Sequence, residues 1–144
     1  MMLTHVTIVV SDQNAALEFY TQKMGFEKKA DYQIPGQPRW LTVGPRGQAI
    51  EMILWQAGSG PVPNMPASLK TPGNGTGMVL EVDDCRKTFA EWKARGVKFT
   101  DAAPLEAGWG FAADFVDPDG NPFKIHETRK SSETADWAKA SKKA

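Results

Sequence analysis

An imidazole and an amine lie close together near the end of the chain. The segment VDPDGNPFKIHE, residues 116–127, begins with clustered turn residues and continues as a predicted strand. If Phe123 and Ile125 point into a core, the period of two in a strand sends Lys124 and His126 to the opposite face. Both side chains can donate or accept a proton. The sequence therefore predicts a candidate acid–base or binding face on this strand.

The same alternation places two further chemical groups on strand faces. Near the N-terminus, a buried stripe of Val6, Ile8 and Val10 leaves His5 on the other face. In a later strand, burial of Ile50, Met52 and Leu54 turns Glu51 outward and would also turn Ile53 outward. We therefore expect His5, Glu51, Lys124 and His126 to face one cleft.

The elements that position these residues form an internal repeat. HVTIVVSD (5–12) overlays GMVLEVDD (77–84), and each is followed by a helical apolar stripe that ends at a glycine, Gly25 or Gly96. The later segments WLTVGPRGQAIE and AADFVDPDGNPFK also overlay. They share a motif of Pro, any residue, Gly and then a residue with a side-chain amide. Each half is thus predicted to contain one strand, one helix and three further strands.

The repeat predicts an α+β fold with one domain over residues 1–128. Its two modules are 1–56 and 75–128, and the Gly- and Pro-rich segment 57–74 between them is predicted to be a linker. A half of about 55 residues has a single helix, which covers only one face of its sheet, so the halves are expected to share a core. Residues 129–144 form a tail with helix-forming residues around Trp137.

Composition excludes several classes of partner. The 144 residues carry 17 Lys and Arg and 17 Asp and Glu, so a formal net charge of zero argues against attraction to nucleic acid or an anionic membrane. The N-terminus shows neither a signal peptide nor a membrane-spanning run. A single cysteine, Cys85, cannot form an internal disulfide, and it falls on the apolar stripe of a predicted helix as a core residue. A cytoplasmic protein with a small-molecule partner is predicted.

The segments THVTIVVSDQNAALEFYTQKMGFE and DFVDPDGNPFKIHE, placed in a duplicated strand-helix-three-strand unit, resemble the vicinal oxygen chelate superfamily. This group contains glyoxalase, extradiol dioxygenase and bleomycin-resistance proteins, and the resemblance covers residues 3–128. It implies two tandem βαβββ modules that form a curved mixed β-sheet cleft with the helices outside. It also implies a homodimer. In metal-dependent members, it implies a divalent ion whose ligand positions fall here on His5, Glu51, Gly77 and Lys124.

This sequence departs from the metal-binding pattern at two of these four positions. His5 and Glu51 are ligand types that suit Zn, Ni, Mn or Fe, whereas Gly77 has no side chain and the ammonium of Lys124 repels a cation. Three alternatives remain open: His126 completes a ligand set with His5 and Glu51, Glu51 and Lys124 neutralise each other without an ion, or His5 and Glu51 hold a weakly bound ion with waters.

Aromatic side chains are the candidate ligand contacts. Trp109 lies in the glycine-rich segment EAGWGFAA, which we interpret as a movable lid, and Arg39 is a candidate partner for a ligand carboxylate. Packing in the core is the alternative for each aromatic residue. The residues predicted to contact a ligand are Trp40, Arg39, Trp55, Trp109, Phe111, Phe115 and His126.

Three functions follow from these residues. The first is metal-independent binding of a small aromatic or planar compound. The second is a divalent-metal lyase, isomerase or dioxygenase in which Glu51 moves a proton. The third is catalysis without a metal, with Lys124 or His126 as acid or base. Gly77 and Lys124 favour the first over the second.

Overall fold

The chain separates into two units, neither of which is continuous in sequence. In the computed structural model, residues 1–60, 71–75 and 77–129 are described. Unit 1 comprises Met1–Thr76 together with Asp117–Pro122, and unit 2 comprises Gly77–Val116 together with the chain from Phe123 onward. The predicted helix around Trp137 and most of the predicted linker lie outside the described residues.

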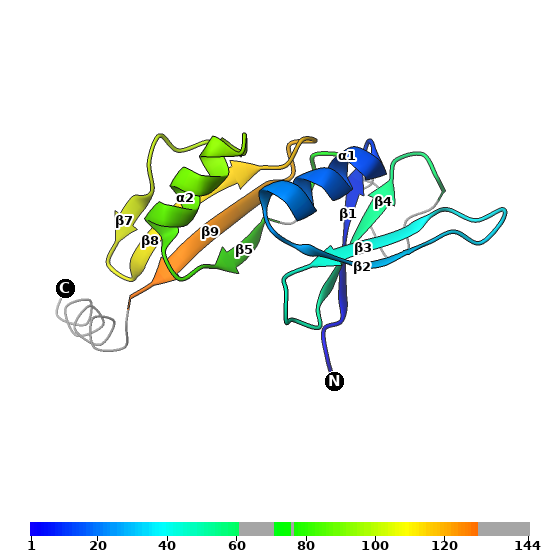
Figure 1. Ribbon diagram of the computed structural model, residues 1–144, viewed down its shortest axis with the longest axis horizontal. Coiled ribbons are helices and arrows are strands. Elements are labelled where there is room, and N and C mark those ends of the chain that lie inside the picture. The colour runs from blue at the N-terminus through cyan, green and yellow to red at the C-terminus, as the bar shows by residue number, and fades with distance from the viewer. Residues whose placement is uncertain (61–70, 76, 130–144) are drawn as a thin grey trace. The chain divides into compact units, whose positions relative to one another are not determined.

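Unit 1 is a four-stranded mixed sheet with one helical segment (Figure 1). The strand order is β1-β4-β3-β2, in which β1 pairs with β4 in parallel and the other pairs are antiparallel. Helix α1 continues directly into η1, a single π-helical turn. The elements are β1 (His5–Val10), α1 (Gln13–Glu18), η1 (Phe19–Lys23), β2 (Glu27–Tyr32), β3 (Trp40–Gly44) and β4 (Glu51–Gln56).

Unit 2 repeats this topology with one additional strand. Its order is β5-β9-β8-β6, with β5 and β9 parallel and β7 pairing with β8 in antiparallel fashion. Unit 1 shows the strand-helix-three-strand pattern, unit 2 repeats it with β7 as a fourth strand after the helix, and the α+β class with two mixed sheets is confirmed. The elements are β5 (Met78–Glu81), α2 (Cys85–Ala94), β6 (Lys98–Phe99), β7 (Leu105–Ala107), β8 (Gly110–Val116) and β9 (Pro122–Thr128).

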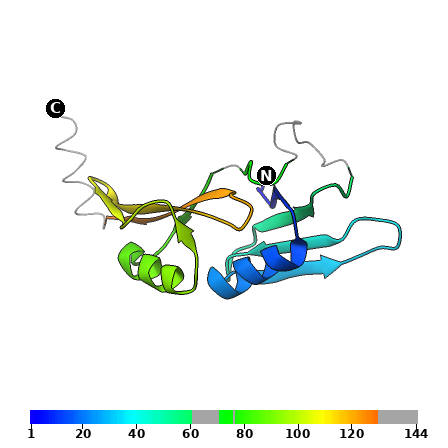
Figure 2. The same cartoon turned by 90° about the horizontal axis from the view of Figure 1, so that it is seen from above.

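The two helices begin and end in the same way. The side chains of Asp12 and Asp84 cap the N-termini of α1 and α2 by accepting hydrogen bonds from backbone N–H groups. After each helical segment comes a glycine with positive φ, +76° at Gly25 and +94° at Gly96, a conformation that other residues rarely adopt. Each helix lies against one face of the sheet of its own unit (Figures 1 and 2).

The core of unit 1 extends to both faces of its sheet. Ile8, Val10 and Leu54 are fully buried, as the alternation predicts. Val9 and Ile53, on the other face, are also buried, with 2% and 8% of their surface exposed. Ile53 lies on the face of Glu51, as the alternation predicts, but it is buried there and not exposed, whereas Thr7 on the same face is partly exposed.

The core of unit 2 is a cluster of aromatic rings between α2 and the sheet. Phe115 is 1% exposed, stacks on Phe123 at 5.3 Å between ring centroids and meets Trp92 edge-on at 5.4 Å. Phe99 also packs against Phe115, at 5.5 Å. Cys85, at the start of α2, is fully buried, which confirms the prediction of a core cysteine, and this burial raises the pKa of its thiol to about 11.

The turn between β8 and β9 belongs to unit 1. The hydroxyl of Tyr20 donates to a carboxylate oxygen of Asp117 at 2.6 Å, and both side chains are buried. Asp117 also accepts from the backbone N–H groups of Asp119 and Asn121 and from the Asn121 side-chain amide. Burial raises the pKa of Tyr20, with the Asp117 carboxylate as the second cause. The predicted turn is thus also a buried polar anchor.

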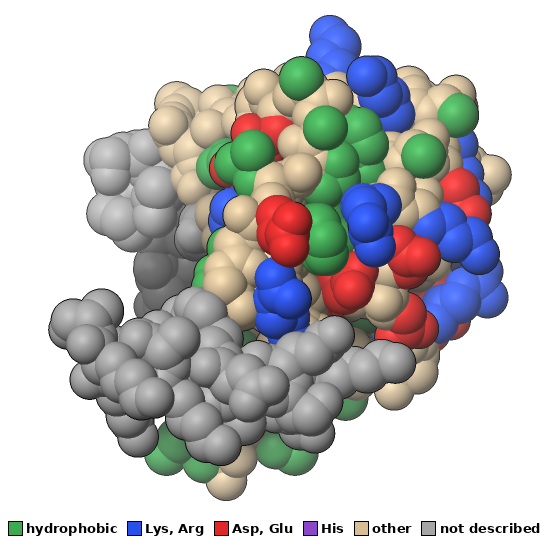
Figure 3. All heavy atoms as spheres, turned by 90° about the vertical axis from the view of Figure 1, so that its left-hand side faces the viewer, with side chains coloured by type: hydrophobic (Ala, Val, Ile, Leu, Met, Phe, Trp, Pro, Cys, Tyr) green, Lys and Arg blue, Asp and Glu red, His purple; other side chains and the backbone are tan. Residues whose placement is uncertain are grey.

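The surface carries both signs of charge. Acidic and basic side chains are interspersed with apolar ones on the face drawn in Figure 3. Among the described residues, no helix has the length and apolar character needed to cross a membrane.

Candidate functional site

In unit 1, His5 and Glu51 meet on the sheet face opposite α1. They are register partners on the parallel strands β1 and β4, and Nε2 of His5 lies 3.4 Å from Oε2 of Glu51. The other carboxylate oxygen accepts a hydrogen bond from the hydroxyl of Thr42 at 2.6 Å. The ring of Trp40 lies 6.1 Å from the imidazole, between centroids. The result is a partly exposed carboxylate, imidazole and indole in contact.

In unit 2, the same three chemical groups come together from other residues. Nε2 of His126 lies 2.5 Å from Oε2 of Glu81, its register partner on the parallel strands β5 and β9. The backbone N–H and the hydroxyl of Thr128 donate to the two Glu81 oxygens, each at 3.1 Å. The ring of Trp109 meets the imidazole edge-on at 5.5 Å.

The histidine and the glutamate occupy opposite strands in the two clusters. Unit 1 has the histidine on its first strand and the glutamate on the strand that pairs with it, whereas unit 2 has Glu81 first and His126 on the paired strand. The repeat matches His5 with Gly77 and Glu51 with Lys124, and so the sequence analysis did not identify Glu81. The signal that could have found it is the parallel pairing of β5 with β9, which sets Glu81 opposite His126.

Lys124 has a partner within its own unit. Its ammonium lies 2.7 Å from Oδ1 of Asp114 on β8, in a partly exposed ion pair. The predicted pairs that join the two units, Glu51 with Lys124 and the set of His5, Glu51 and His126, stay predictions. In the described parts of both units, no group of three or more His, Cys, Asp or Glu residues is arranged to hold a metal ion.

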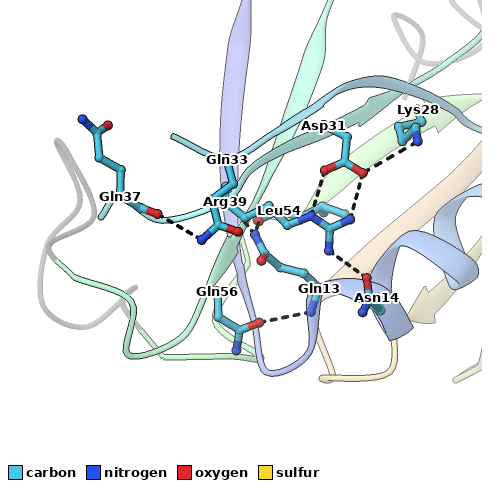
Figure 4. A network of polar contacts seen from close by, with 9 residues as sticks. All are labelled: Gln13, Asn14, Lys28, Asp31, Gln33, Gln37, Arg39, Leu54 and Gln56. Atoms are coloured by element: carbon cyan, nitrogen blue, oxygen red, sulfur yellow. Dashed lines mark hydrogen bonds and ion pairs between the residues drawn. The ribbon is translucent and has the colours of Figure 1, made fainter. Parts of the chain in front are cut away.

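Arg39 is part of a hydrogen-bond network around the start of α1 (Figure 4). Its guanidinium donates to both carboxylate oxygens of Asp31 at 2.8 Å and to the side chain of Asn14 at 2.7 Å. The Arg39 hydrogen bonds lower the pKa of Asp31. The side chain of Gln13 donates to the carbonyls of Leu54 and Arg39. The arginine predicted to bind a ligand carboxylate thus already holds a protein carboxylate.

The remaining aromatic candidates fall on different faces. Phe111 and Phe115 lie on the α2 side of their sheet, because the guanidinium of Arg86 sits 4.5 Å over the Phe111 ring and Phe115 packs in the core. That is the face opposite Lys124. Trp55 shares the face of Glu51, and its buried Nε1 has no hydrogen-bond partner in the part of the chain that is described.

Trp109 occupies the tip of a tight β7–β8 hairpin. A Cβ atom at Gly110 would lie only 1.8 Å from the carbonyl oxygen of Glu127, so only glycine fits there. The backbone N–H of Arg129 donates to the carbonyl of Trp109 at 2.7 Å. The glycine therefore allows close packing on β9, with Trp109 beside His126, and the movable lid stays a prediction.

Comparisons with known proteins agree on one relationship. The model of the Glyoxalase/Bleomycin resistance protein/Dioxygenase superfamily matches residues 2–125. The uncharacterized protein YetH of Bacillus subtilis (strain 168) is 31% identical over 122 residues, 85% of this chain and 94% of that protein.

Solved structures show the same relationship. TnmS3, an antibiotic binding protein from Streptomyces sp. CB03234, is 32% identical with a TM-score of 0.74, covering 90% of this chain and 97% of its own. A superfamily member from Sphaerobacter thermophilus DSM 20745 is 35% identical, with a TM-score of 0.74 and coverage of 88% and 97%.

Proposed function

The chain belongs to the Glyoxalase/Bleomycin resistance protein/Dioxygenase superfamily, and from that premise we propose that it binds a small planar or aromatic molecule without a complete family-type metal site. Because fold alone does not fix function, the proposal rests on particular side chains. The observation that carries it is the indole beside an imidazole in each unit, Trp40 with His5 and Trp109 with His126.

These pairs suit a flat ligand. An indole offers a broad apolar face for stacking, and a neighbouring imidazole offers one directional hydrogen bond, which together favour planar rings with a polar substituent. Trp40, His126 and Trp109 are all partly exposed. The antibiotic binding named for TnmS3, a protein 32% identical to this chain, supports a small-molecule ligand.

The family-type metal positions fit an ion incompletely. Of the four positions, His5 and Glu51 supply donors, Gly77 supplies none, and Lys124 brings an ammonium that is already paired with Asp114. In the proposed mode of binding, Lys124 pairs with Asp114 and does not hold an ion.

The alternative is a divalent-metal lyase, isomerase or dioxygenase that uses His5 and Glu51, with His126 as a third ligand. The observation that favours it is the 3.4 Å approach of the His5 imidazole to the Glu51 carboxylate. These are N and O donors that suit Zn, Ni, Mn or Fe.

The first test is elemental metal content. Wild-type protein and His5→Ala, both untagged and purified without chelator, would be measured side by side. We expect less than one tenth of an equivalent of metal in both. Metal close to one equivalent in the wild type that is lost in His5→Ala would replace the binding proposal by the metal enzyme.

The second test is ligand binding. We expect planar aromatic compounds, antibiotics included, to bind and so to raise the melting temperature of the protein. We expect Trp40→Leu and Trp109→Leu each to lower the affinity for these compounds at least tenfold. Ile34→Ala is the control, because Ile34 is an exposed apolar residue between β2 and β3, outside the strands that carry the two indoles. Equal losses in all three variants, or none, would contradict the assignment of the two indoles.

The homodimer and the cytoplasmic location implied above belong to the same proposal. Sedimentation equilibrium of the full chain tests the first, and fractionation of cells tests the second.

A further inference from the structure

The Glu81–His126–Thr128 cluster determines which nitrogen of the His126 imidazole donates a hydrogen bond and which one accepts. Nε2 of His126 faces Oε2 of Glu81 at 2.5 Å, and an ionised carboxylate only accepts hydrogen bonds. The proton of a neutral His126 therefore resides on Nε2, and Nδ1 is left as an acceptor. Nδ1 has no hydrogen-bond partner among residues 1–60, 71–75 and 77–129.

Thr128 fixes the position of the Glu81 carboxylate by two hydrogen bonds. Its backbone N–H donates to Oε1 of Glu81, and its hydroxyl donates to Oε2, the oxygen that meets the imidazole. A carboxylate fixed at three points orients the imidazole in the way that supporting hydrogen bonds orient other functional histidines. The Trp109 ring, 5.5 Å away, bounds the same space with an apolar surface.

We infer that His126 and Trp109 form a subsite for a planar ligand that carries a hydroxyl donor, phenolic or enolic, and that Glu81 is the positioning residue that keeps Nδ1 of His126 an acceptor. This inference rests on the proposed function. The ring of the ligand packs against Trp109, and its O–H donates to Nδ1. The side chain of His126 is 28% exposed, so the imidazole is accessible to a ligand in part.

Glu81→Gln is a sharp test because the geometry dictates its outcome. The Thr128 N–H can only donate, so the amide oxygen of the glutamine must take the Oε1 position. The amide NH₂ then takes the Oε2 position and donates to Nε2 of His126. The proton of the imidazole moves to Nδ1, and the subsite changes from acceptor to donor without a change of shape.

The tautomer would be read first, from two-bond ¹H–¹⁵N spectra of the ring at pH 8. The chain has two histidines, so a His5→Asn background isolates His126. We expect the Nε2–H pattern with Glu81 and the Nδ1–H pattern in Glu81→Gln. Glu91→Gln, an exposed glutamate on α2, is the matched control and should keep the Nε2–H pattern. An Nδ1–H pattern in the parent, or no change in Glu81→Gln, would overturn the inference.

Binding would be measured next with 2-naphthol, 2-methoxynaphthalene and naphthalene at pH 7. We expect the protein to prefer 2-naphthol over 2-methoxynaphthalene by about tenfold, the value of one hydrogen bond. This preference should disappear in Glu81→Gln and persist in Glu91→Gln. Equal affinity for all three compounds would overturn the inference while leaving the proposed function in place. Binding of none of them would overturn the proposed function, and the inference would fall with it.

Discussion

The two units have the same strand order but are stabilised by different kinds of contact. Among the described residues, the four buried polar side chains, Gln13, Thr42, Asp117 and Asn121, all belong to unit 1. Unit 2 buries a cluster of aromatic rings around Phe115 instead. Directional hydrogen bonds fix one arrangement, whereas ring packing contributes more area and tolerates small shifts. The comparison teaches that a repeated topology does not require a repeated core.

The largest effect is expected from removing the central ring of unit 2. Phe115→Ala should lower the free energy of unfolding by about 4 kcal/mol, because it leaves a cavity between Phe123, Trp92 and Phe99. Urea denaturation followed by circular dichroism measures the loss. Phe111→Ala is the control and should cost less than half as much, because that ring is only half-buried.

A somewhat smaller effect is expected from the anchor of unit 1. Asp117→Ala should cost about 3 kcal/mol, because the buried Tyr20 hydroxyl and the Asn121 amide lose their carboxylate acceptor. The same denaturation assay tests it. Asp119→Ala, which removes an exposed acceptor of Ser11, should cost no more than about 1 kcal/mol. Similar losses in the two variants would contradict the special role of the buried turn.

The Tyr20 phenol should make stability depend on alkaline pH. Its pKa is raised in the folded protein, so its contribution is fully present below the unfolded pKa of about 10 and is lost as pH rises above it. Between pH 8 and pH 11 the wild type should lose about 1.4 kcal/mol from this group.

Denaturation of Tyr20→Phe at the same two pH values isolates that loss, because the variant lacks the ionisable phenol. Tyr32→Phe is the control, since Tyr32 is exposed and is the only other tyrosine in the chain. If Tyr20→Phe and the wild type lose the same amount, the buried phenol is not the cause.

The smallest effect is expected at Arg39. Arg39→Lys should cost about 0.5 kcal/mol, because lysine cannot reproduce the two parallel hydrogen bonds to Asp31 but keeps the charge. The contribution of Asp31, whose pKa is lowered, is present above its unfolded pKa and is lost as pH falls below about 4.

Ligand affinity distinguishes the structural role of Arg39, as the partner of Asp31, from the ligand contact predicted from the sequence. We expect Arg39→Lys to bind planar compounds as the wild type does. A tenfold weaker affinity for carboxylated compounds alone would restore Arg39 as a ligand contact.

The fold was predictable because its signals are local and repeated. Capping aspartates, helix-ending glycines and strand alternation occur twice, and each has its physical reason within a few residues. The burial of Ile53 was not predictable in this way, because it depends on what covers the second face of the sheet.

The candidate site was predictable only in part. Lys124 and His126 point away from Phe123 and Ile125, as the alternation requires, and both are less buried than those two core residues. The Glu81–His126 pair depends on strand register, and the Tyr20–Asp117 contact joins positions far apart in the chain, so neither follows from local pattern. Counting back across the turn at Asp117–Asn121 would have placed Phe115 opposite Phe123, on the core face.

The anchored turn has a consequence for the order in which the protein can be made. Unit 1 needs Asp117–Pro122, so its hydrogen bonds cannot be completed until the ribosome has also synthesised Gly77–Val116. At about 5–20 residues per second, that stretch takes roughly 2–8 s. During this interval the nascent first half lacks Asp117, the partner of Tyr20. A chaperone that binds nascent chains would act on unit 1 during this time.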